Sequence, residues 1–94
     1  MKIFYNVTES SVDSPSFNVT YTSDKTGAST QANSNSDYWS SGEIILNEGQ
    51  FISMTVDCTA PLYDFVVTVY KDGGIWDRKE LHNPTGSVTI SGKP

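Results

Sequence analysis

The sequence has little of what proteins use for covalent chemistry and for crossing membranes. It contains one cysteine, one histidine and only six basic residues. Because Cys58 is the only cysteine, an internal disulfide is excluded. No apolar run approaches the roughly 20 residues that span a bilayer, and the N-terminus lacks the apolar segment of a signal peptide. These absences predict a chain that is soluble as written; replacement of an export signal by the initiator methionine is kept as a hypothesis.

Positive charge is also scarce. The formal net charge is −5, and the only adjacent basic pair is Arg78 and Lys79. Nucleic-acid binding depends largely on Lys and Arg neutralising phosphates, so no nucleic-acid partner is expected. A basic cluster that would attract an anionic membrane surface is missing for the same reason.

Helix-forming sequence is the third absence. Ala and Leu are infrequent, and no window shows an apolar period of 3.6 residues. Ser, Thr and Asn are abundant instead, and the apolar residues are mostly β-branched or aromatic, which suits a half-buried sheet. A chain of 94 residues supports one hydrophobic core, so residues 1–94 are predicted to form a single domain.

What is present is alternation of apolar and polar residues. It is clearest at 16–23 and at 50–59, where the alternation places Cys58 on the buried side as an inert thiol. We expect an edge strand at 2–9, a weak polar strand at 28–33 and a central strand at 62–71. The complete set of expected strands is 2–9, 16–23, 28–33, 43–46, 50–59, 62–71, 75–81 and 87–91. Seven to eight short, mostly antiparallel strands predict an all-β sandwich, with a small barrel as the alternative.

Residues for catalysis or metal binding are few. His82 lies beside Asn83, Pro84 and Gly86, so it is expected to be exposed in a turn rather than to act as a base. One histidine and one cysteine cannot supply a zinc site, and no cofactor is expected. Calcium is a minor alternative, because carboxylates lie near several predicted strand ends, although not at the spacing of a calcium loop. These carboxylates are Asp57, Asp64, Asp72 and Asp77.

The aromatic residues are the remaining candidates for function. Packing between the sheets is the favoured role for Trp39 and Trp76, whereas Tyr70 is expected on the surface. If several of these side chains are exposed on one face, they can form a platform for a sugar or a peptide. The aromatic residues weighed for this role are Tyr38, Trp39, Tyr63, Tyr70 and Trp76, and a possible binding surface is assigned to Tyr38, Trp39, Tyr70 and Trp76.

The order of segments resembles the extracytoplasmic domain of the mycobacterial membrane protein small (MmpS) family and similar small bacterial lipoproteins. The resemblance covers most of the chain. It rests on residues 5–8 (Tyr-Asn-Val-Thr), 19–22 (Val-Thr-Tyr-Thr), 39–40 (Trp-Ser), 48–51 (Glu-Gly-Gln-Phe) and 67–74 (Val-Thr-Val-Tyr-Lys-Asp-Gly-Gly). It implies an immunoglobulin-like sandwich outside the cytoplasmic membrane, periplasmic or on the cell surface, that assists a membrane partner such as an export pump. The membrane anchor of the family is missing here, and of its cysteine pair only Cys58 is present.

Three functions follow as hypotheses. The first is a non-catalytic interaction or accessory domain that engages a protein partner at the cell envelope through a sheet face or an edge strand. The alternative is a carbohydrate-binding module that uses exposed aromatic side chains. The third, a small hydrolase, would need His82 beside a hydroxyl and an acid in a pocket.

Overall fold

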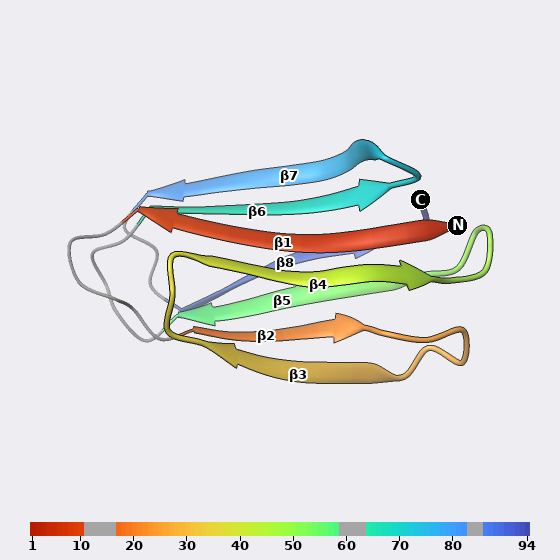
Figure 1. Cartoon of the computed structure of the whole chain (residues 1–94), viewed down its shortest axis with the longest axis horizontal. Coiled ribbons are helices and arrows are strands. Elements are labelled where there is room, and N and C mark those ends of the chain that lie inside the picture. Colours follow the sequence, from red (N-terminus) through yellow and green to blue (C-terminus); the bar gives the residue numbers. More distant parts are fainter. Residues whose placement is uncertain (11–16, 59–63, 83–85) are drawn as a thin grey trace.

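The computed structural model describes residues 1–10, 17–58, 64–82 and 86–94, and it shows an all-β protein. The strands are β1 (Lys2–Ser10), β2 (Phe17–Thr22), β3 (Ser29–Ser34), β4 (Tyr38–Ile45), β5 (Ile52–Cys58), β6 (Asp64–Lys71), β7 (Gly74–His82) and β8 (Gly86–Gly92). They form two antiparallel four-stranded sheets that pack together (Figure 1). The predicted β-sandwich is therefore confirmed, whereas its immunoglobulin-like type stays a prediction.

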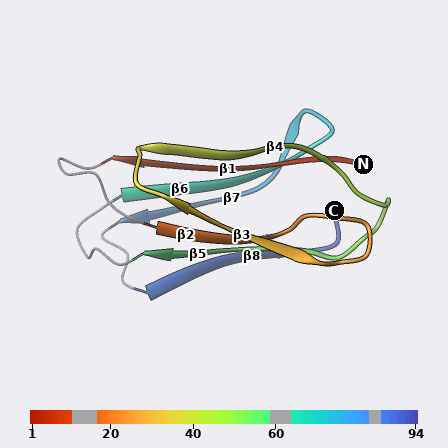
Figure 2. The same cartoon turned by 60° about the horizontal axis from the view of Figure 1, so that its bottom comes forward.

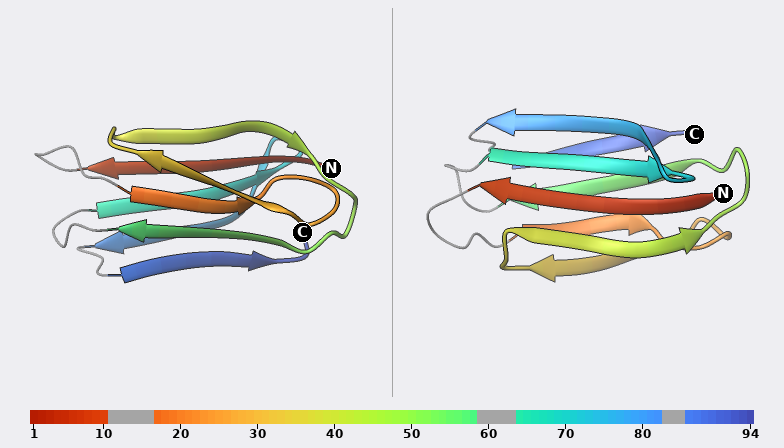
Figure 3. Two further views of the ribbon diagram at one scale, coloured as in Figure 1. Left: turned by 90° about the horizontal axis from the view of Figure 1, so that it is seen from below. Right: turned by 45° about the horizontal axis from the view of Figure 1, so that its top comes forward.

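Each sheet contains strands from both halves of the chain. Sheet A has the order β4-β1-β6-β7, and sheet B has the order β3-β2-β5-β8. Figure 2 and the left panel of Figure 3 show the two layers, with β3 and β4 along one flank of the sandwich. On the opposite flank, β7 of sheet A lies near β8 of sheet B.

Two predictions about individual strands were wrong. The segment at 2–9 was expected at an edge, but β1 is an inner strand that pairs with both β4 and β6. The alternation of apolar and polar residues predicts which face of the strand is buried, but it does not predict which strands pair with it. β4 is also longer than the predicted strand at 43–46, because the polar residues from Tyr38 onward pair with β1. The central position predicted for 62–71 is confirmed for β6, which lies between β1 and β7.

The core lies between the inner faces of the two sheets. Every second residue of the inner strands points into it, as the alternation predicts. Each fully buried aliphatic or aromatic side chain contributes roughly 1.5–3 kcal/mol to folding. The buried apolar residues are Ile3, Tyr5, Val7, Phe17, Val19, Leu46, Ile52, Met54, Val56, Phe65, Val67, Val69 and Ile90.

Tyr5 links the two sheets through this core. Its ring lies 5.2 Å from that of Tyr21 on β2, and its hydroxyl donates a 2.9 Å hydrogen bond to the Thr22 carbonyl. Tyr21 in turn contacts Trp39 of β4, with 5.3 Å between ring centroids. Burial raises the pKa of the Tyr5 hydroxyl above its usual range. This aromatic row fills the sandwich on the flank of β3 and β4.

The turn between β6 and β7 has the geometry that the sequence predicts. Asp72 and Gly73 both have positive φ, at 48° and 86°. A two-residue turn of this type matches the twist of antiparallel strands, and Asp-Gly is one of the pairs that best tolerates it. The strands expected at 62–71 and 75–81 therefore pair as a hairpin, described from Asp64 onward, while residues 62 and 63 lie outside the described residues.

Two further predictions concern the burial of Cys58 and the lack of a membrane-spanning segment. Cys58 belongs to β5, but its side chain lies outside the part that the structure describes, so its expected burial stays a prediction. No helix with the length and apolar character needed to cross a bilayer occurs among the described residues.

Candidate binding face

The outer face of sheet A combines aromatic, apolar and polar side chains. Because Ile3, Tyr5 and Val7 of β1 point inward, the alternate residues Phe4, Asn6 and Thr8 point outward. Register pairing extends this outer face onto the neighbouring strands. Its other members are Tyr38, Ser40 and Glu43 of β4, Val66, Thr68 and Tyr70 of β6, and Ile75, Arg78 and Glu80 of β7.

A β-bulge in β4 shapes one side of this face. The register shifts between Phe4, opposite Glu43, and Asn6, opposite Ser40, so β4 has one extra residue there. Gly42 within the bulge has a φ of 74°, a conformation that favours glycine. Its neighbour Ser41 accepts a 3.0 Å hydrogen bond from the Tyr5 N–H. The bulge thus bends β4 next to the centre of sheet A while the freed backbone donor stays satisfied.

A depression of about 570 Å³ lies on this outer face. This volume is within the range of roughly 300–1,000 Å³ typical of small-molecule sites. Its lining residues come from β1, β4, β6 and the β6–β7 turn. It is lined by Lys2, Ile3, Phe4, Asn6, Thr8, Tyr38, Glu43, Tyr70 and Gly73.

Aromatic and amide groups lie side by side in the depression. Phe4 and Tyr70 are register partners whose rings meet edge to face, with 5.8 Å between centroids and 75° between planes. The next pair along the same two strands is Asn6 and Thr68, which are only 8% and 3% exposed although they point away from the core. Tyr38, at the other end of the lining, is 54% exposed. The face therefore offers one exposed ring, one ring pair and nearly buried polar groups between them.

The charges in the depression balance. Lys2 and Glu43 are both exposed, and they are the two charged side chains of the lining within the part of the chain that the structure describes. The chain as a whole carries −5, so the depression is less acidic than the rest of the surface. A neutral ligand with many hydroxyl groups fits this balance better than a strongly charged one.

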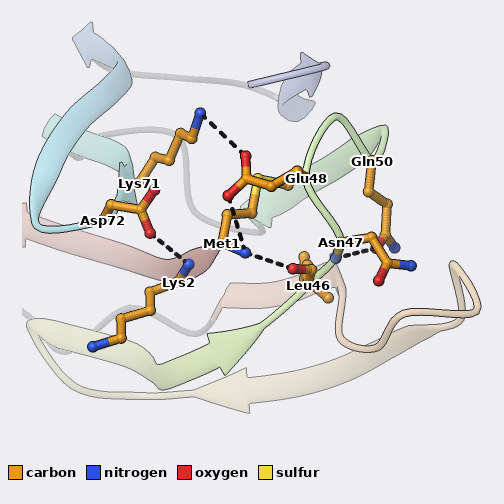
Figure 4. Close-up of polar contacts among 8 residues, drawn as sticks. All are labelled: Met1, Lys2, Leu46, Asn47, Glu48, Gln50, Lys71 and Asp72. Carbon is orange, nitrogen blue, oxygen red and sulfur yellow. Dashed lines mark hydrogen bonds and ion pairs between the residues drawn. The ribbon is translucent and has the colours of Figure 1, made fainter.

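Polar contacts hold the end of sheet A that carries Lys2 (Figure 4). The Lys2 N–H donates a 2.8 Å hydrogen bond to Asp72 Oδ1, and the Met1 ammonium donates one of 2.7 Å to the Leu46 carbonyl. Glu48 lies 3.4 Å from the Met1 ammonium and 3.9 Å from Lys71 Nζ. These contacts connect β1, the β6–β7 turn and the loop after β4, so the rim of the depression is fixed at this end.

The opposite outer face, on sheet B, has no such character. Its rows follow from the register of β3, β2, β5 and β8, with Val19 and Val56 pointing inward. Thr20, Thr55 and Thr89 form one row across three strands, and the Thr55 and Thr89 hydroxyls are 2.9 Å apart. The outward residues are Asn18, Thr20, Thr22, Ser29, Gln31, Asn33, Ser53, Thr55, Asp57, Ser87, Thr89 and Ser91. None of these described residues is aromatic or aliphatic.

The four aromatic residues assigned to a possible binding surface separate into two groups. Tyr38 and Tyr70 both line the depression. Trp39 lies half-buried against the core beside Tyr21. Trp76 occupies the bulge of β7 and packs over Gly92 of β8, where an added Cβ would be 3.2 Å from the indole. Tyr63, also weighed for a platform, lies outside the described residues.

The residues that sequence reasoning missed are mostly those of β1. Phe4, Asn6 and Thr8 line the depression because β1 is an inner strand with a neighbour on each side. The sequence feature that could have identified this face is Phe4, a large apolar residue on the same side of the strand as the polar residues Asn6 and Thr8. Lys2 and Glu43 had no distinguishing pattern in the sequence.

The four aspartates considered for calcium and His82 are not among the residues that line the depression. His82 ends β7, and its Nδ1 is 3.2 Å from Asp64 Oδ1 at the exposed end of sheet A. Asp72 accepts the Lys2 N–H, and Asp77 Oδ1 accepts the Arg78 N–H. Asp57 is exposed on sheet B. Within 1–10, 17–58, 64–82 and 86–94, no three His, Cys, Asp or Glu side chains are grouped in a way that could hold a metal ion.

Comparison of the chain with protein-family models, with curated proteins and with solved structures found no match. The function is therefore inferred from the geometry of the binding face.

Proposed function

We propose that this chain is a non-catalytic carbohydrate-binding domain whose ligand occupies the depression on the outer face of sheet A. The observation that supports this most is the lining itself, in which Tyr38, Phe4 and Tyr70 surround Asn6 and Thr8. Aromatic rings bury the C–H faces of sugars, and amide and hydroxyl groups exchange hydrogen bonds with sugar hydroxyls. Lys2 and Glu43 add one donor group and one acceptor group without a net charge.

The placement of the two tyrosines supports a chain of sugars rather than one ring. Tyr38 is opposite Thr8, and Tyr70 is opposite Phe4, on the other side of β1. Four residues along a strand and two strand spacings across the sheet give a diagonal of about 16 Å. A ligand that reaches both tyrosines must therefore be an oligosaccharide.

The same lining supports binding rather than hydrolysis. Among the described residues, Glu43 is the one carboxyl in the depression, and His82 is at the far end of β7. Glycoside hydrolysis normally uses two carboxyl groups that flank the bond to be cleaved. A ligand held here would remain intact.

The test is a calorimetric titration with neutral oligosaccharides of increasing length, after a glycan array has selected the sugar type. Affinity should rise with each added sugar until both tyrosines are covered, and then stay constant. The intact oligosaccharide should be recovered after incubation. Absence of binding across neutral polysaccharides, or an affinity that does not depend on chain length, would contradict the proposal.

The interaction with a protein partner at the cell envelope stays a prediction. The extracytoplasmic location, the immunoglobulin-like type and the accessory role beside an export pump rest on the resemblance alone and stay predictions.

A further inference from the structure

The four edge strands of the sandwich are not equally protected. Edge strands carry unpaired N–H and C=O groups, and most proteins block them with bulges, charges or covering side chains. The edges here are β4 and β7 of sheet A and β3 and β8 of sheet B. Three of them carry such a block, and β3 does not.

Each of the other three edge strands has a different feature that hinders pairing with another strand. β4 is interrupted by the bulge at Gly42. β7 has a register shift at Trp76, and its edge carries charged residues such as Arg78 and Glu80. On β8, the Lys79 ammonium donates a 2.7 Å hydrogen bond to the Thr89 carbonyl.

β3 has none of these features. Its sequence, Ser-Thr-Gln-Ala-Asn-Ser, contains no charge and no proline, and it pairs with β2 over all six residues without a register shift. Figure 1 and the right panel of Figure 3 place β3 at the margin of the molecule, with β2 on one side only. Among the described residues, β3 pairs with no other strand.

The register shows which backbone groups of β3 face outward. The Ser23 N–H donates to the Ala28 carbonyl at 2.9 Å, so this pair is a hydrogen-bonded pair of the hairpin. In an antiparallel ladder such pairs alternate, which directs the backbone of residues 30, 32 and 34 toward β2. The N–H and C=O groups of Ser29, Gln31 and Asn33 therefore point away from the sheet.

We propose that β3 pairs with β3 of a second copy of this chain, so that two B sheets join into one continuous antiparallel sheet. In the register that satisfies the most groups, Gln31 lies opposite Gln31 of the second copy, on the two-fold axis. Ser29 then lies opposite Asn33 of the second copy, and these three pairs can form up to six backbone hydrogen bonds. On the inner side, Thr30 lies opposite Ala32 of the second copy.

The side chains of β3 fit a second copy because the seam brings no like charges together. Each chain carries −5, and pairing through a charged edge such as β7 would place charged residues in contact. Because each copy has one unblocked edge, pairing closes at two copies and cannot continue into a fibre. A second copy is therefore the occupant that the edge fits.

Sedimentation of the wild-type chain at increasing concentration tests this. The expected result is a reversible monomer–dimer equilibrium. In Gln31→Lys and in Gln31→Glu, each alone, like charges meet at the two-fold axis, so the dimer should dissociate about fivefold more readily or more. An equimolar mixture of the two variants should recover the dimer, because Lys then faces Glu.

Ser91→Lys is the matched control, since Ser91 is also exposed on the outer face of sheet B but lies on the opposite edge strand. It should dimerise as the wild type does. A wild-type chain that stays monomeric at millimolar concentration, or a mixture of Lys and Glu variants that stays monomeric, would overturn the proposal. The Gln31 variants leave the outer face of sheet A unchanged, so sugar binding and dimer formation fail or succeed independently.

Discussion

The two outer faces of this sandwich cover the same core, yet they differ in almost every side chain. Sheet A presents Phe4, Tyr38 and Tyr70 around a depression, whereas the outward residues of sheet B are hydroxyls, amides and one carboxylate. Both sheets fold by burying their inner faces, so folding alone does not require aromatic residues outside. This difference is the reason that the proposed ligand is placed on sheet A.

The largest contrast is expected in stability. Phe4→Ala should lower the free energy of unfolding by about 2 kcal/mol, because Phe4 is half-buried against Tyr70. Thr20→Ala, at an outward position of sheet B, should cost about 0.5 kcal/mol. Urea denaturation measures both values. Equal losses would mean that the two outer faces contribute alike to stability, which would contradict the difference described above.

The next contrast is in ligand affinity. Tyr70→Ala should weaken oligosaccharide binding about tenfold, since one aromatic contact is worth up to about 1.5 kcal/mol. Thr89→Ala is the control on sheet B and should bind as the wild type does. Calorimetry gives the affinities, and circular dichroism verifies that each variant keeps its fold. An equal loss in both variants would place the ligand elsewhere.

A third contrast lies between the outside of sheet A and its inside, where Tyr5 is buried. The pKa of the Tyr5 hydroxyl is raised by burial, so the native state holds this proton at a pH where the unfolded chain releases it. The resulting stability is fully present below about pH 10 and is lost above it, by up to about 1.4 kcal/mol per pH unit.

Urea midpoints of the wild type and of Tyr5→Phe between about pH 8 and 11 test this. The variant loses the hydrogen bond to Thr22 at every pH but should show a shallower alkaline decline. Parallel curves for the two proteins would show that Tyr5 does not cause the decline.

The smallest effect is expected in the turn that leads into β3. A hydrogen bond from the Thr26 hydroxyl, joined by backbone N–H groups of Thr26 and Ala28, lowers the pKa of Asp24. The native state therefore binds this proton less readily than the unfolded chain does. Ionised Asp24 therefore stabilises the fold at a pH above its unfolded pKa of about 4. This contribution decreases as the pH falls through the lower pKa that Asp24 has in the native state.

Asp24→Asn should remove part of the acid dependence of unfolding: the variant should be less stable than the wild type at neutral pH, and the difference should shrink as the pH falls through the native pKa of Asp24. Urea midpoints between about pH 2 and 6 measure it. An acid dependence identical to that of the wild type would exclude Asp24 as a contributor.

The sequence predicted the inner faces well and the outer faces poorly, for one physical reason. Alternation reports which side of a strand is buried, and it identified Val19, Met54 and Val56 as core residues. It does not report which strands are neighbours, so β1 was placed at an edge and Phe4 was overlooked. The depression exists only once β1 lies between β4 and β6.

Tyr38 and Tyr70 were singled out because they interrupt a polar stretch or oppose an apolar face, and both line the depression. The two tryptophans were assigned to the same candidate surface, but the structure packs both against the core, which confirms the role that the sequence favoured for them. Trp39 follows Tyr38 directly and so points to the other side of β4, against the core. Trp76 occupies a bulge, and a single-residue register shift of this kind has no clear mark in the sequence.

The central position of β1 also affects how the molecule is made. β1 is synthesised before its partners at residues 38–45 and 64–71, so it cannot be paired on both sides until the chain has been synthesised through β6. Pairings between segments so distant in sequence form slowly, on the scale of milliseconds to seconds in β-sandwich domains. During that interval the apolar side of β1 is unpaired, and the net negative charge of the chain opposes association with neighbouring chains.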